Sequence, residues 1–289
     1  MAITYNNLYM DIRQQFHQAG LPGATLEARE LVAYAAGKTR QEVQRDGQLY
    51  VPTEVTQRAY DLAQRHLQGE PVAYLIGEWE FYGLPLDISE SVLIPRPDTE
   101  VLAEQVITYV NTLTLPRVLD LCAGSGCVGL AVAKQCPRVK VALGDISEPA
   151  LRICRQNIRR NGLGNQAVPV LLDAREKPPA HLGEFEVIVC NPPYIPDEEI
   201  AGLDASVRDY EPLLALQGGP DGLDFYRAIA EKWRDALARN GRLYFEVGIG
   251  QANDVMRIMR QNGFGELQIV PDLHGIPRVV YGTKYDSIS

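Results

Sequence analysis

From Arg117 onward, short apolar and β-branched segments alternate with amphipathic stretches that have the period of a helix. This alternation predicts an α/β domain in which helices cover both faces of a mainly parallel, doubly wound sheet. The expected strands span 118–121, 140–144, 168–172, 185–190, 242–247, 266–270 and 278–283, and the expected helices lie near 127–135, 148–161, 222–239 and 250–262. The connection from Pro271 to Pro277 is too short for a helical crossover, so the last strand should run antiparallel to the strand before it.

Residues 1–75 have a helical pattern without strands between the helices, so they are expected to form a small, all-helical N-terminal domain. Near its start, four apolar side chains recur at helical spacing: Tyr5, Leu8, Ile12 and Phe16. Thr39 and Glu42 have the spacing of a capping box, and Thr53 after a proline is expected to cap another helix. No catalytic set of residues occurs in this domain, so its expected role is packing or substrate recognition.

A β-hairpin linker is expected over residues 76–92, where alternating apolar side chains flank Gly83. The α/β domain should then span residues 93–289. In its first segment, prolines prevent a helix until Asp98 or Thr99 can cap one.

The charge of the chain limits its partners. The 289 residues have a net charge of −9, and 46% of them are hydrophobic, which is enough for a full core. Residues 1–77 hold seven basic and eight acidic side chains, so nearly all of the negative charge lies in residues 78–289. A surface of this sign repels phosphate, which argues against stable nucleic-acid binding. No leader pattern and no apolar run of about 18 residues is found, so a cytoplasmic protein without a membrane span is expected.

The cysteines and the N-terminal histidines do not indicate a metal site. The number of cysteines is odd and no Cys-x-x-Cys pair occurs among Cys122, Cys127, Cys136, Cys154 and Cys190. Buried, reduced thiols are therefore expected, and no metal. His17 and His66 lack a carboxylate or cysteine pattern nearby, so they are expected to be structural or exposed.

A glycine-rich loop, Asp120-Leu-Cys-Ala-Gly-Ser-Gly126, follows the first strand of the α/β domain and opens a helix. Its glycines let the backbone turn tightly and approach a ligand closely, which indicates a nucleotide site. Asp145 stands 21 residues after Gly124, at the end of the next strand, as a ribose ligand would. The spacing also fits an NAD enzyme, although the acidic Asp120 does not. In an alternative interpretation, Asp145 caps the next helix and Asp120 binds loop amides.

The strand expected at 185–190 ends in Asn191-Pro-Pro-Tyr194. Each proline holds the residue before it extended, so this turn is stiff. The Asn191 side-chain oxygen and the Pro192 carbonyl can then act as two convergent acceptors for one NH2 group. Tyr194 adds an aromatic face for a planar amide or base. The turn predicts a site for a carboxamide or an exocyclic amine, although a plain exit from a strand also fits a bare Asn-Pro-Pro.

Several segments together resemble the bacterial release-factor glutamine methyltransferases, the HemK/PrmC family. They are Phe81-Tyr-Gly-Leu, Leu93-Ile-Pro-Arg-Pro-Asp-Thr-Glu100, Asp120 to Gly126, Asn191 to Tyr194, Tyr210-Glu-Pro212, Gly218-Gly-Pro-Asp-Gly-Leu-Asp-Phe-Tyr226 and Gly275-Ile-Pro-Arg-Val-Val280. The resemblance covers nearly the whole chain and departs from the usual first motif at Cys122, where glycine is commoner. It implies a Rossmann-like, seven-stranded, S-adenosylmethionine-dependent methyltransferase domain after a helical domain and a hairpin linker.

The resemblance also implies a reaction. The substrate would be the glutamine of the Gly-Gly-Gln motif in class 1 peptide chain release factors, methylated on its side-chain nitrogen by a monomeric enzyme. The catalytic residues would be Asn191, Pro192 and Tyr194, and the same turn with Pro193 would bind the substrate. The cofactor, S-adenosyl-L-methionine, would contact Cys122, Ala123, Gly124, Ser125, Gly126, Asp145 and Asn191. Asp173 and Ala174 follow the third strand, where the adenine would lie.

Other activities are compatible with the same turn. Related enzymes that methylate a glutamine of a ribosomal protein share the Asn191 turn, and adenine N6 and cytosine N4 are also NH2 groups on conjugated carbon. The acidic charge and the lack of an inserted base-reading segment make nucleic-acid methylation the weaker alternative. A non-catalytic protein that senses the cofactor would leave the Asn191 turn idle.

Overall fold

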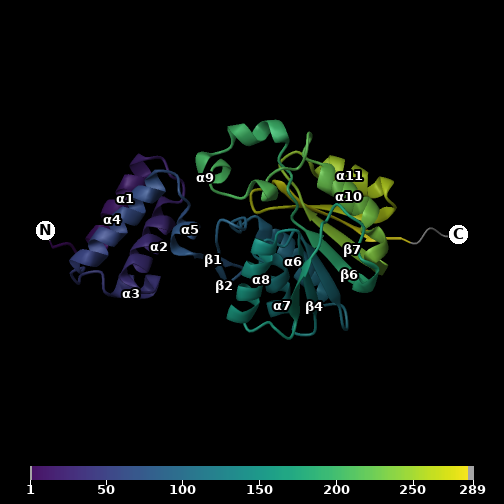
Figure 1. The fold of residues 1–289 in the computed structure, drawn as a ribbon, viewed down its shortest axis with the longest axis horizontal. Helices are drawn as coiled ribbons and strands as arrows, with labels where there is room; N and C mark the ends of the chain where they lie inside the picture. Colours follow the sequence, from purple (N-terminus) through teal and green to yellow (C-terminus); the bar gives the residue numbers. More distant parts are fainter. Residues whose placement is uncertain (1, 286–289) are drawn as a thin grey trace. The chain divides into compact units, whose positions relative to one another are not determined.

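The computed structural model of the protein describes residues 2–285 (Figure 1). The chain folds into two compact units. The first comprises Met1–Glu78 with Ala205–Tyr210, and the second comprises Trp79–Asp204 with Glu211–Ser289.

Over the residues that the structure describes, the regular elements of the first unit are helices, apart from one isolated backbone bridge and the first residue of strand β1 at its end, which confirms the predicted helical N-terminal region. Its helices are α1 (Tyr5–Gln18), α2 (Ala24–Ala36), α3 (Arg40–Arg45), α4 (Thr53–Leu67), α5 (Val72–Ile76) and the short α9 (Ala205–Arg208). The four apolar side chains that recur along α1 are all buried, as the spacing predicted. The helices form because this stripe is buried against α2 and α4.

The starts of α3 and α4 differ in their capping. Thr39 and Glu42 form the predicted capping box: the Glu42 N–H donates to Thr39 Oγ1 over 3.2 Å, and the Thr39 N–H donates to Glu42 Oε2 over 2.8 Å. The prediction for Thr53 was wrong. Pro52 occupies the N-cap position of α4 and no side chain caps this end, because the helix already begins at Thr53.

Replacing Thr39 by alanine is expected to lower the free energy of unfolding of the first unit by about 1 kcal/mol, because the Glu42 N–H loses its partner, the Thr39 hydroxyl. Thr53→Ala is the matched control, since this threonine also starts a helix but makes no capping bond. Urea denaturation followed by circular dichroism measures both variants. Equal effects of the two substitutions would contradict the assignment of the cap.

His66 is buried, with 6% of its surface exposed, whereas His17 is exposed. Although no carboxylate pattern surrounds His66 in the sequence, the fold brings Glu27 to it, with His66 Nε2 3.3 Å from Glu27 Oε2. Its Nδ1 lies 2.8 Å from the Glu70 carbonyl oxygen, and its ring packs edge-on against Phe16. Burial alone would lower the pKa of His66, but the hydrogen bonds to Glu27 and Glu70 raise it above the ordinary value. The structural role expected for His66 is confirmed.

The predicted hairpin is present as β1 (Glu78–Phe81) and β2 (Leu84–Asp87). Its second strand is bound to the rest of the second unit through Asn157, whose Oδ1 accepts the Asp87 N–H over 2.6 Å and whose Nδ2 donates to the Asp87 carbonyl over 3.1 Å. Asn157 Nδ2 also lies 2.9 Å from the Ser125 carbonyl oxygen. One buried asparagine therefore connects the hairpin to the glycine-rich loop.

The second unit contains a seven-stranded sheet in the order β5-β4-β3-β6-β7-β9-β8. Its strands are β3 (Arg117–Leu121), β4 (Lys140–Asp145), β5 (Ala167–Leu171), β6 (Phe185–Cys190), β7 (Leu237–Glu246), β8 (Phe264–Pro271) and β9 (Pro277–Lys284). The five strands β3 to β7 pair in parallel, whereas β9 is antiparallel to both β7 and β8. The predicted doubly wound sheet with a reversed last strand is confirmed.

Helices cover both faces of this sheet (Figure 1): α6 (Thr99–Val110), α7 (Cys127–Gln135) and α8 (Glu148–Arg160) lie on one face, and α10 (Asp224–Lys232) and α11 (Ala252–Gln261) lie on the other. Four 3₁₀ turns complete the unit: η1 (Ala180–Leu182), η2 (Asp197–Gly202), η3 (Leu213–Ala215) and η4 (Arg234–Ala236). The helix predicted at 222–239 was too long. It ends at Lys232 because Leu237 already pairs with Phe185 as the start of β7.

Candidate active site

Two loops of the second unit lie next to each other at the end of the sheet where its parallel strands terminate. The glycine-rich loop leaves the carboxyl end of β3, and the Asn191 turn leaves the carboxyl end of β6. These strands are neighbours, with Leu121 opposite Cys190. The order of the strands reverses here, because β4 lies on one side of β3 and β6 on the other. In open α/β sheets, ligands bind at the carboxyl ends of the strands at such a reversal.

The glycine-rich loop uses left-handed backbone at three positions. Cys122, Gly124 and Gly126 have φ angles of 58°, 55° and 82°. A side chain at Gly124 would point into space without protein atoms within 4 Å, whereas one at Gly126 would lie 3.1 Å from Leu143. The loop is therefore packed on its inner side and open over Gly124. Cys122 adopts a conformation that glycine adopts without strain, which explains in physical terms why glycine suits this position.

The two acidic residues near this loop have different environments. Asp120 is 2% exposed and accepts the Gly129 N–H over 2.8 Å, so it binds a backbone amide of the first turn of α7. Burial raises the pKa of Asp120 to about 7. Asp145 is partly buried and accepts the N–H groups of Gly124 and Ser147, each over 2.8 Å. Ser147, and not Asp145, caps α8, since its Oγ accepts the Ala150 N–H.

The loop and Asp145 together fit a nucleoside. Each Asp145 oxygen accepts one backbone N–H, and a carboxylate oxygen has a second lone pair that a ribose hydroxyl can use. The space over Gly124 is open beside this carboxylate. Asp120, in contrast, is directed into the fold and does not face this space.

Asp173 and Ala174 have fewer free polar groups for a cofactor than the sequence suggested. The Asp173 carboxylate is 3.3 Å from the Arg175 guanidinium and accepts the Arg175 N–H over 2.8 Å. Although burial acts in the opposite direction, the hydrogen bonds with Arg175 hold its pKa below the ordinary value. Ala174 is 4% exposed, and its carbonyl accepts the indole N–H of the buried Trp233 over 2.8 Å. Both residues therefore have partners within the protein.

The Asn191 turn presents two acceptors. Asn191 Nδ2 points toward Thr99 Oγ1 at 3.4 Å, so the amide nitrogen is directed into the protein. Within residues 2–285, no hydrogen-bond donor reaches Asn191 Oδ1 or the carbonyl oxygen of Pro192. Tyr194 is half-buried, and burial raises the pKa of its hydroxyl to about 12, so the ring stays neutral. The arrangement can accept both hydrogens of one NH2 group beside an aromatic ring.

Glycines and Gln251 hold the turn in place. A side chain on Gly218 would lie 2.7 Å from the Tyr194 Cα, and one on Gly222 would lie 2.3 Å from the Tyr194 carbonyl oxygen. This oxygen accepts from Gln251 Nε2 over 2.9 Å, and Ile195 pairs with Gln217 in a parallel bridge. The glycines at 218 and 222 therefore allow another loop to pack directly on the backbone of the turn.

Three ion pairs involve segments that carried the family resemblance. Arg96, fixed between prolines, pairs with the Glu211 carboxylate, which is 5% exposed. Arg278 binds Asp98 over 2.9 Å and Asp272 over 3.2 Å. Asp98 precedes α6 but makes no capping bond, so the predicted cap is absent and the side chain pairs with β9 instead. These contacts hold the start of α6 next to the sheet edge that carries the turn.

Replacing Arg96 by methionine is expected to lower the free energy of unfolding by about 2–3 kcal/mol at pH 8. This is below the ~3–5 kcal/mol typical of breaking a buried ion pair, because the Arg96 side chain is 38% exposed. Burial already raises the pKa of Glu211. Without Arg96 the pKa of Glu211 should rise further. More of Glu211 is then protonated at pH 5 than at pH 8, so the loss in free energy of unfolding should be smaller at pH 5. Urea denaturation at both pH values measures the effect, and Glu211→Gln in the same background should recover most of it. A loss of equal size at both pH values would refute this account.

Three residues beside the turn were not identified as site residues from the sequence: Thr99, Glu246 and Gln251. Thr99 was noted only as a possible cap of α6, yet it contacts Asn191. Glu246 follows three mainly apolar residues at the end of β7 and is 3% exposed. A charged residue that closes such a strand is the one sequence signal that could have identified it.

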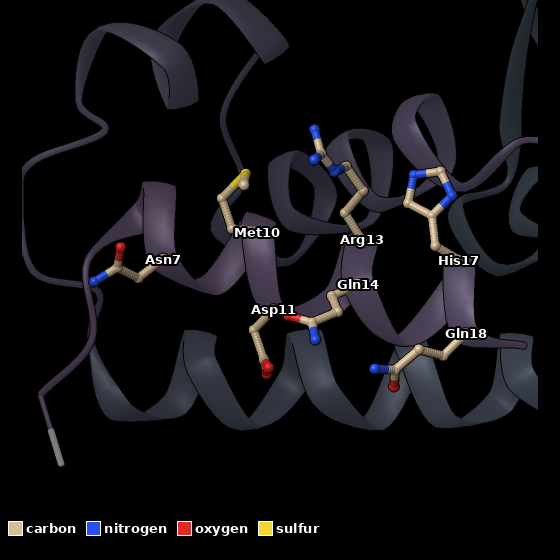
Figure 2. Close-up of a pocket in the computed structure, with 7 residues that line it drawn as sticks. All are labelled: Asn7, Met10, Asp11, Arg13, Gln14, His17 and Gln18. Atoms are coloured by element: carbon tan, nitrogen blue, oxygen red, sulfur yellow. The ribbon is translucent and has the colours of Figure 1, made fainter.

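Other candidate sites are weaker. A surface hollow of about 580 Å³ lies along α1 of the first unit, and Figure 2 shows its lining residues on that one helix. Its carboxylate, Asp11, already binds Gln15 and the Tyr60 hydroxyl. Within residues 2–285, no three His, Cys, Asp or Glu side chains are grouped to hold a metal ion, and no helix is both long and apolar enough to cross a membrane.

Comparisons with known proteins agree with this geometry. Residues 98–204 match the family model for a methyltransferase small domain, and residues 7–77 match that for a PrmC N-terminal domain. The fold is similar to that of the hMettl16 catalytic domain solved with the MAT2A 3'UTR hairpin 6, with a TM-score of 0.57 and 16% identity over 79% of this chain and 84% of that chain. Fold and site together define a methyltransferase with a Rossmann-like domain.

Sequence identity to known methyltransferases shows the family within this class. The release factor glutamine methyltransferase of Thermodesulfovibrio yellowstonii is 38% identical over 82% of this chain and 85% of its own length. That of Neisseria gonorrhoeae is 39% identical over 90% of this chain and 93% of its own length. The chain belongs to the release factor glutamine methyltransferases.

Proposed function

We propose that this enzyme transfers a methyl group from S-adenosyl-L-methionine to the side-chain nitrogen of the glutamine in the Gly-Gly-Gln motif of class 1 peptide chain release factors. Membership of the family supports the reaction and the substrate. The observation that carries the proposal is the pair of unused acceptors, Asn191 Oδ1 and the Pro192 carbonyl, beside the half-buried Tyr194. Two acceptors suit a carboxamide NH2 group.

The difficulty of the reaction is electronic, because the lone pair of an amide nitrogen is delocalised into its carbonyl group. When bound, S-adenosyl-L-methionine supplies an electrophilic methyl group on a sulfonium. Asn191 and Pro192 each accept one N–H of the glutamine, which fixes its nitrogen and leaves the remaining lobe free. Tyr194 holds the planar amide on its ring. Alignment of this kind is worth about 7–11 kcal/mol, so positioning is the main contribution of these residues. The proton of the methylated nitrogen is very acidic and leaves to water or to a neighbouring oxygen.

The same two acceptors select glutamine over glutamate. A glutamate carboxylate has no hydrogens to donate, so it would face Asn191 Oδ1 and the Pro192 carbonyl with lone pairs. Leaving buried acceptors without donors costs about 1–3 kcal/mol for each group. The enzyme should therefore discriminate strongly against a release factor that carries Gly-Gly-Glu.

The cofactor residues in this proposal lie at the reversal of the strand order. Cys122, Ala123, Gly124, Ser125 and Gly126 would hold the amino-acid end, and Asp145 would accept both ribose hydroxyls. Asn191 would border the same space. Asp173 and Ala174 would limit the adenine position, mainly through backbone, because the Asp173 carboxylate and the Ala174 carbonyl already have partners. Residues 1–75 would recognise the release factor, with the hairpin at 76–92 joining them to the catalytic domain at 93–289.

The test is transfer of a labelled methyl group to purified release factor, followed by mass spectrometry of the Gly-Gly-Gln peptide. The expected result is one added methyl group on the glutamine, and none after that glutamine is changed to glutamate. Labelling of a DNA duplex, or of a ribosomal protein in place of the release factor, would replace the proposal with one of those activities. Binding of NADH without binding of S-adenosyl-L-methionine would exclude a methyltransferase.

A further inference from the structure

The Asn191 carboxamide can serve the reaction in only one orientation. Its oxygen must face the substrate, since a flip of the amide would direct an NH2 group at another NH2 group. The oxygen and nitrogen ends have nearly the same shape, so packing alone does not choose between them. A residue that binds only the nitrogen end is therefore required.

Thr99 lies directly behind the amide. It is the first residue of α6, only 2% exposed, and its Oγ1 lies 3.4 Å from Asn191 Nδ2. A hydroxyl can also donate, however, so it could bind either end of an amide. Thr99 by itself does not fix the orientation of Asn191.

Glu246 supplies the missing direction. Burial raises the pKa of Glu246, and hydrogen bonding from the Thr99 and Asn191 side chains acts in the opposite direction, which places both side chains beside its carboxylate. A carboxylate only accepts, so it takes the hydrogen of the Thr99 hydroxyl and leaves the hydroxyl oxygen to accept from Asn191. The chain of donors then runs from Asn191 through Thr99 to Glu246, and the Asn191 oxygen faces outward.

A buried glutamate at position 246 lowers the stability of the fold, so its presence there indicates a functional role. It is 3% exposed between the fully buried Phe245 and Val247, and its Oε2 has no hydrogen-bond partner within residues 2–285. Burial of a charge without full pairing costs several kcal/mol, and an apolar residue would usually be more stable there. Arg278 favours the charged form of Glu246 and Asp98 opposes it, but the Arg278 guanidinium is hydrogen-bonded to Asp98 and Asp272.

We propose that Glu246, acting through Thr99, is the positioning residue that holds the Asn191 carboxamide with its oxygen toward the substrate NH2 group. The inference rests on the proposed function and adds two residues to it. Neither residue needs to touch the substrate or the cofactor.

Glu246→Gln and Thr99→Val test the proposal with the release factor as substrate. Glutamine can turn its own NH2 group toward Thr99, so the flipped Asn191 amide becomes accessible. We expect kcat/KM to fall about 10- to 100-fold in both variants, the range expected for loss of a buried hydrogen bond to a charged group. The dissociation constant of the cofactor should stay within about twofold of the wild-type value, and Thr99→Ser should restore most of the activity.

A second measurement reports orientation directly. A release factor carrying Gly-Gly-Glu should inhibit the wild-type enzyme weakly, because its carboxylate meets two acceptors. In Glu246→Gln, the flipped Asn191 offers it an NH2 group, so its inhibition constant relative to the KM of the normal substrate should fall about 10-fold. A purely structural role would not change this ratio.

The pH profile gives a third measurement. Burial raises the pKa of Glu246 to about 7. The groups that interact electrostatically with it are Arg278, Asp98, Cys127, Tyr194 and Tyr226, and burial holds the thiol and the two phenols neutral near pH 7. A protonated Glu246 can donate as well as accept and no longer selects one end of Asn191. Activity should therefore fall as the pH drops through about 7 in the wild type, and Glu246→Gln should lack this acid limb.

Thr283→Val is the matched control, because Thr283 is also a buried threonine of this sheet whose hydroxyl donates to a glutamate, Glu266, over 3.0 Å. It pairs with Arg242, four residues before Glu246 on β7, away from the Asn191 turn. Its kcat/KM should match the wild type. The inference would be overturned if Glu246→Gln kept the wild-type kcat/KM and the wild-type ratio of inhibition constant to KM. A fall in kcat/KM that is matched by an equal fall in cofactor affinity would overturn it as well. Absence of labelling by the wild-type enzyme would instead refute the proposed function.

Discussion

Asn191→Ala should abolish methyl transfer while the protein still binds its cofactor. Alanine removes one of the two acceptors and leaves the substrate nitrogen held by the Pro192 carbonyl alone, free to rotate about that single bond. Since a displacement of about 1 Å can cost about 100-fold, we expect kcat to fall at least 100-fold. Cofactor affinity should fall by no more than about 10-fold, the value of one hydrogen bond. Rates with labelled cofactor and a calorimetric titration separate the two effects.

The control for this substitution is Asn165→Ala, which removes an exposed amide whose side chain makes no hydrogen bond within residues 2–285. It should have wild-type rates. If Asn191→Ala kept full activity, the two-acceptor arrangement would not carry catalysis. If it lost cofactor binding and turnover together, Asn191 would serve the cofactor and not the substrate.

The parts of the site that were predictable from sequence are those set by local backbone rules. Proline constrains its neighbours whatever the fold, so the stiff turn after β6 could be predicted from Asn191-Pro-Pro-Tyr194 alone. Glycine spacing after an apolar strand likewise predicted the loop at Gly124 and Gly126. Because parallel strands end at the same edge of a sheet, the alternation of strands and helices then placed both segments together.

The parts that sequence did not reveal depend on contacts between distant residues. Thr99 meets Asn191 across 92 positions, and Gln251 reaches Tyr194 across 57. No local pattern distinguishes Thr99 as a partner of Asn191 from Thr99 as a helix cap. The sequence therefore predicts the residues of the turn but not the distant residues that contact it.

The end of the helix predicted at 222–239 also depends on contacts between residues that are distant in the sequence. From Asp224 to Asn240 no glycine or proline interrupts the helical pattern. The helix nevertheless ends at Lys232, where the indole of Trp233 binds the Ala174 carbonyl, and Leu237 pairs with β6 soon afterwards. Pairing in the sheet overrides the local preference, and only the tertiary structure shows where it begins.

Gly218→Ala should inactivate the enzyme through the backbone, although residue 218 has no side chain to lose. The added methyl group would lie 2.7 Å from the Tyr194 Cα and 2.8 Å from its carbonyl carbon, closer than such contacts ever are. Backbone atoms cannot rotate away as a flexible side chain does, so either the turn or the 218–222 loop must move. Overpacking of this kind costs about 1–3 kcal/mol in stability. A shift of the turn by about 1 Å would lower kcat about 100-fold.

Gly202→Ala is the matched control, because this glycine belongs to the same connection between β6 and α10, lacks a left-handed φ angle and has no atom within 4 Å of an added methyl group. It should keep wild-type kcat and stability. Comparing kcat with the midpoint of thermal unfolding separates displacement of the turn from general destabilisation. At a temperature where both variants are fully folded, Gly218→Ala should still be about 100-fold slower. If its rate returned to the wild-type value there, the close packing of Gly218 on Tyr194 would matter for stability alone, and the position of the turn would not depend on it.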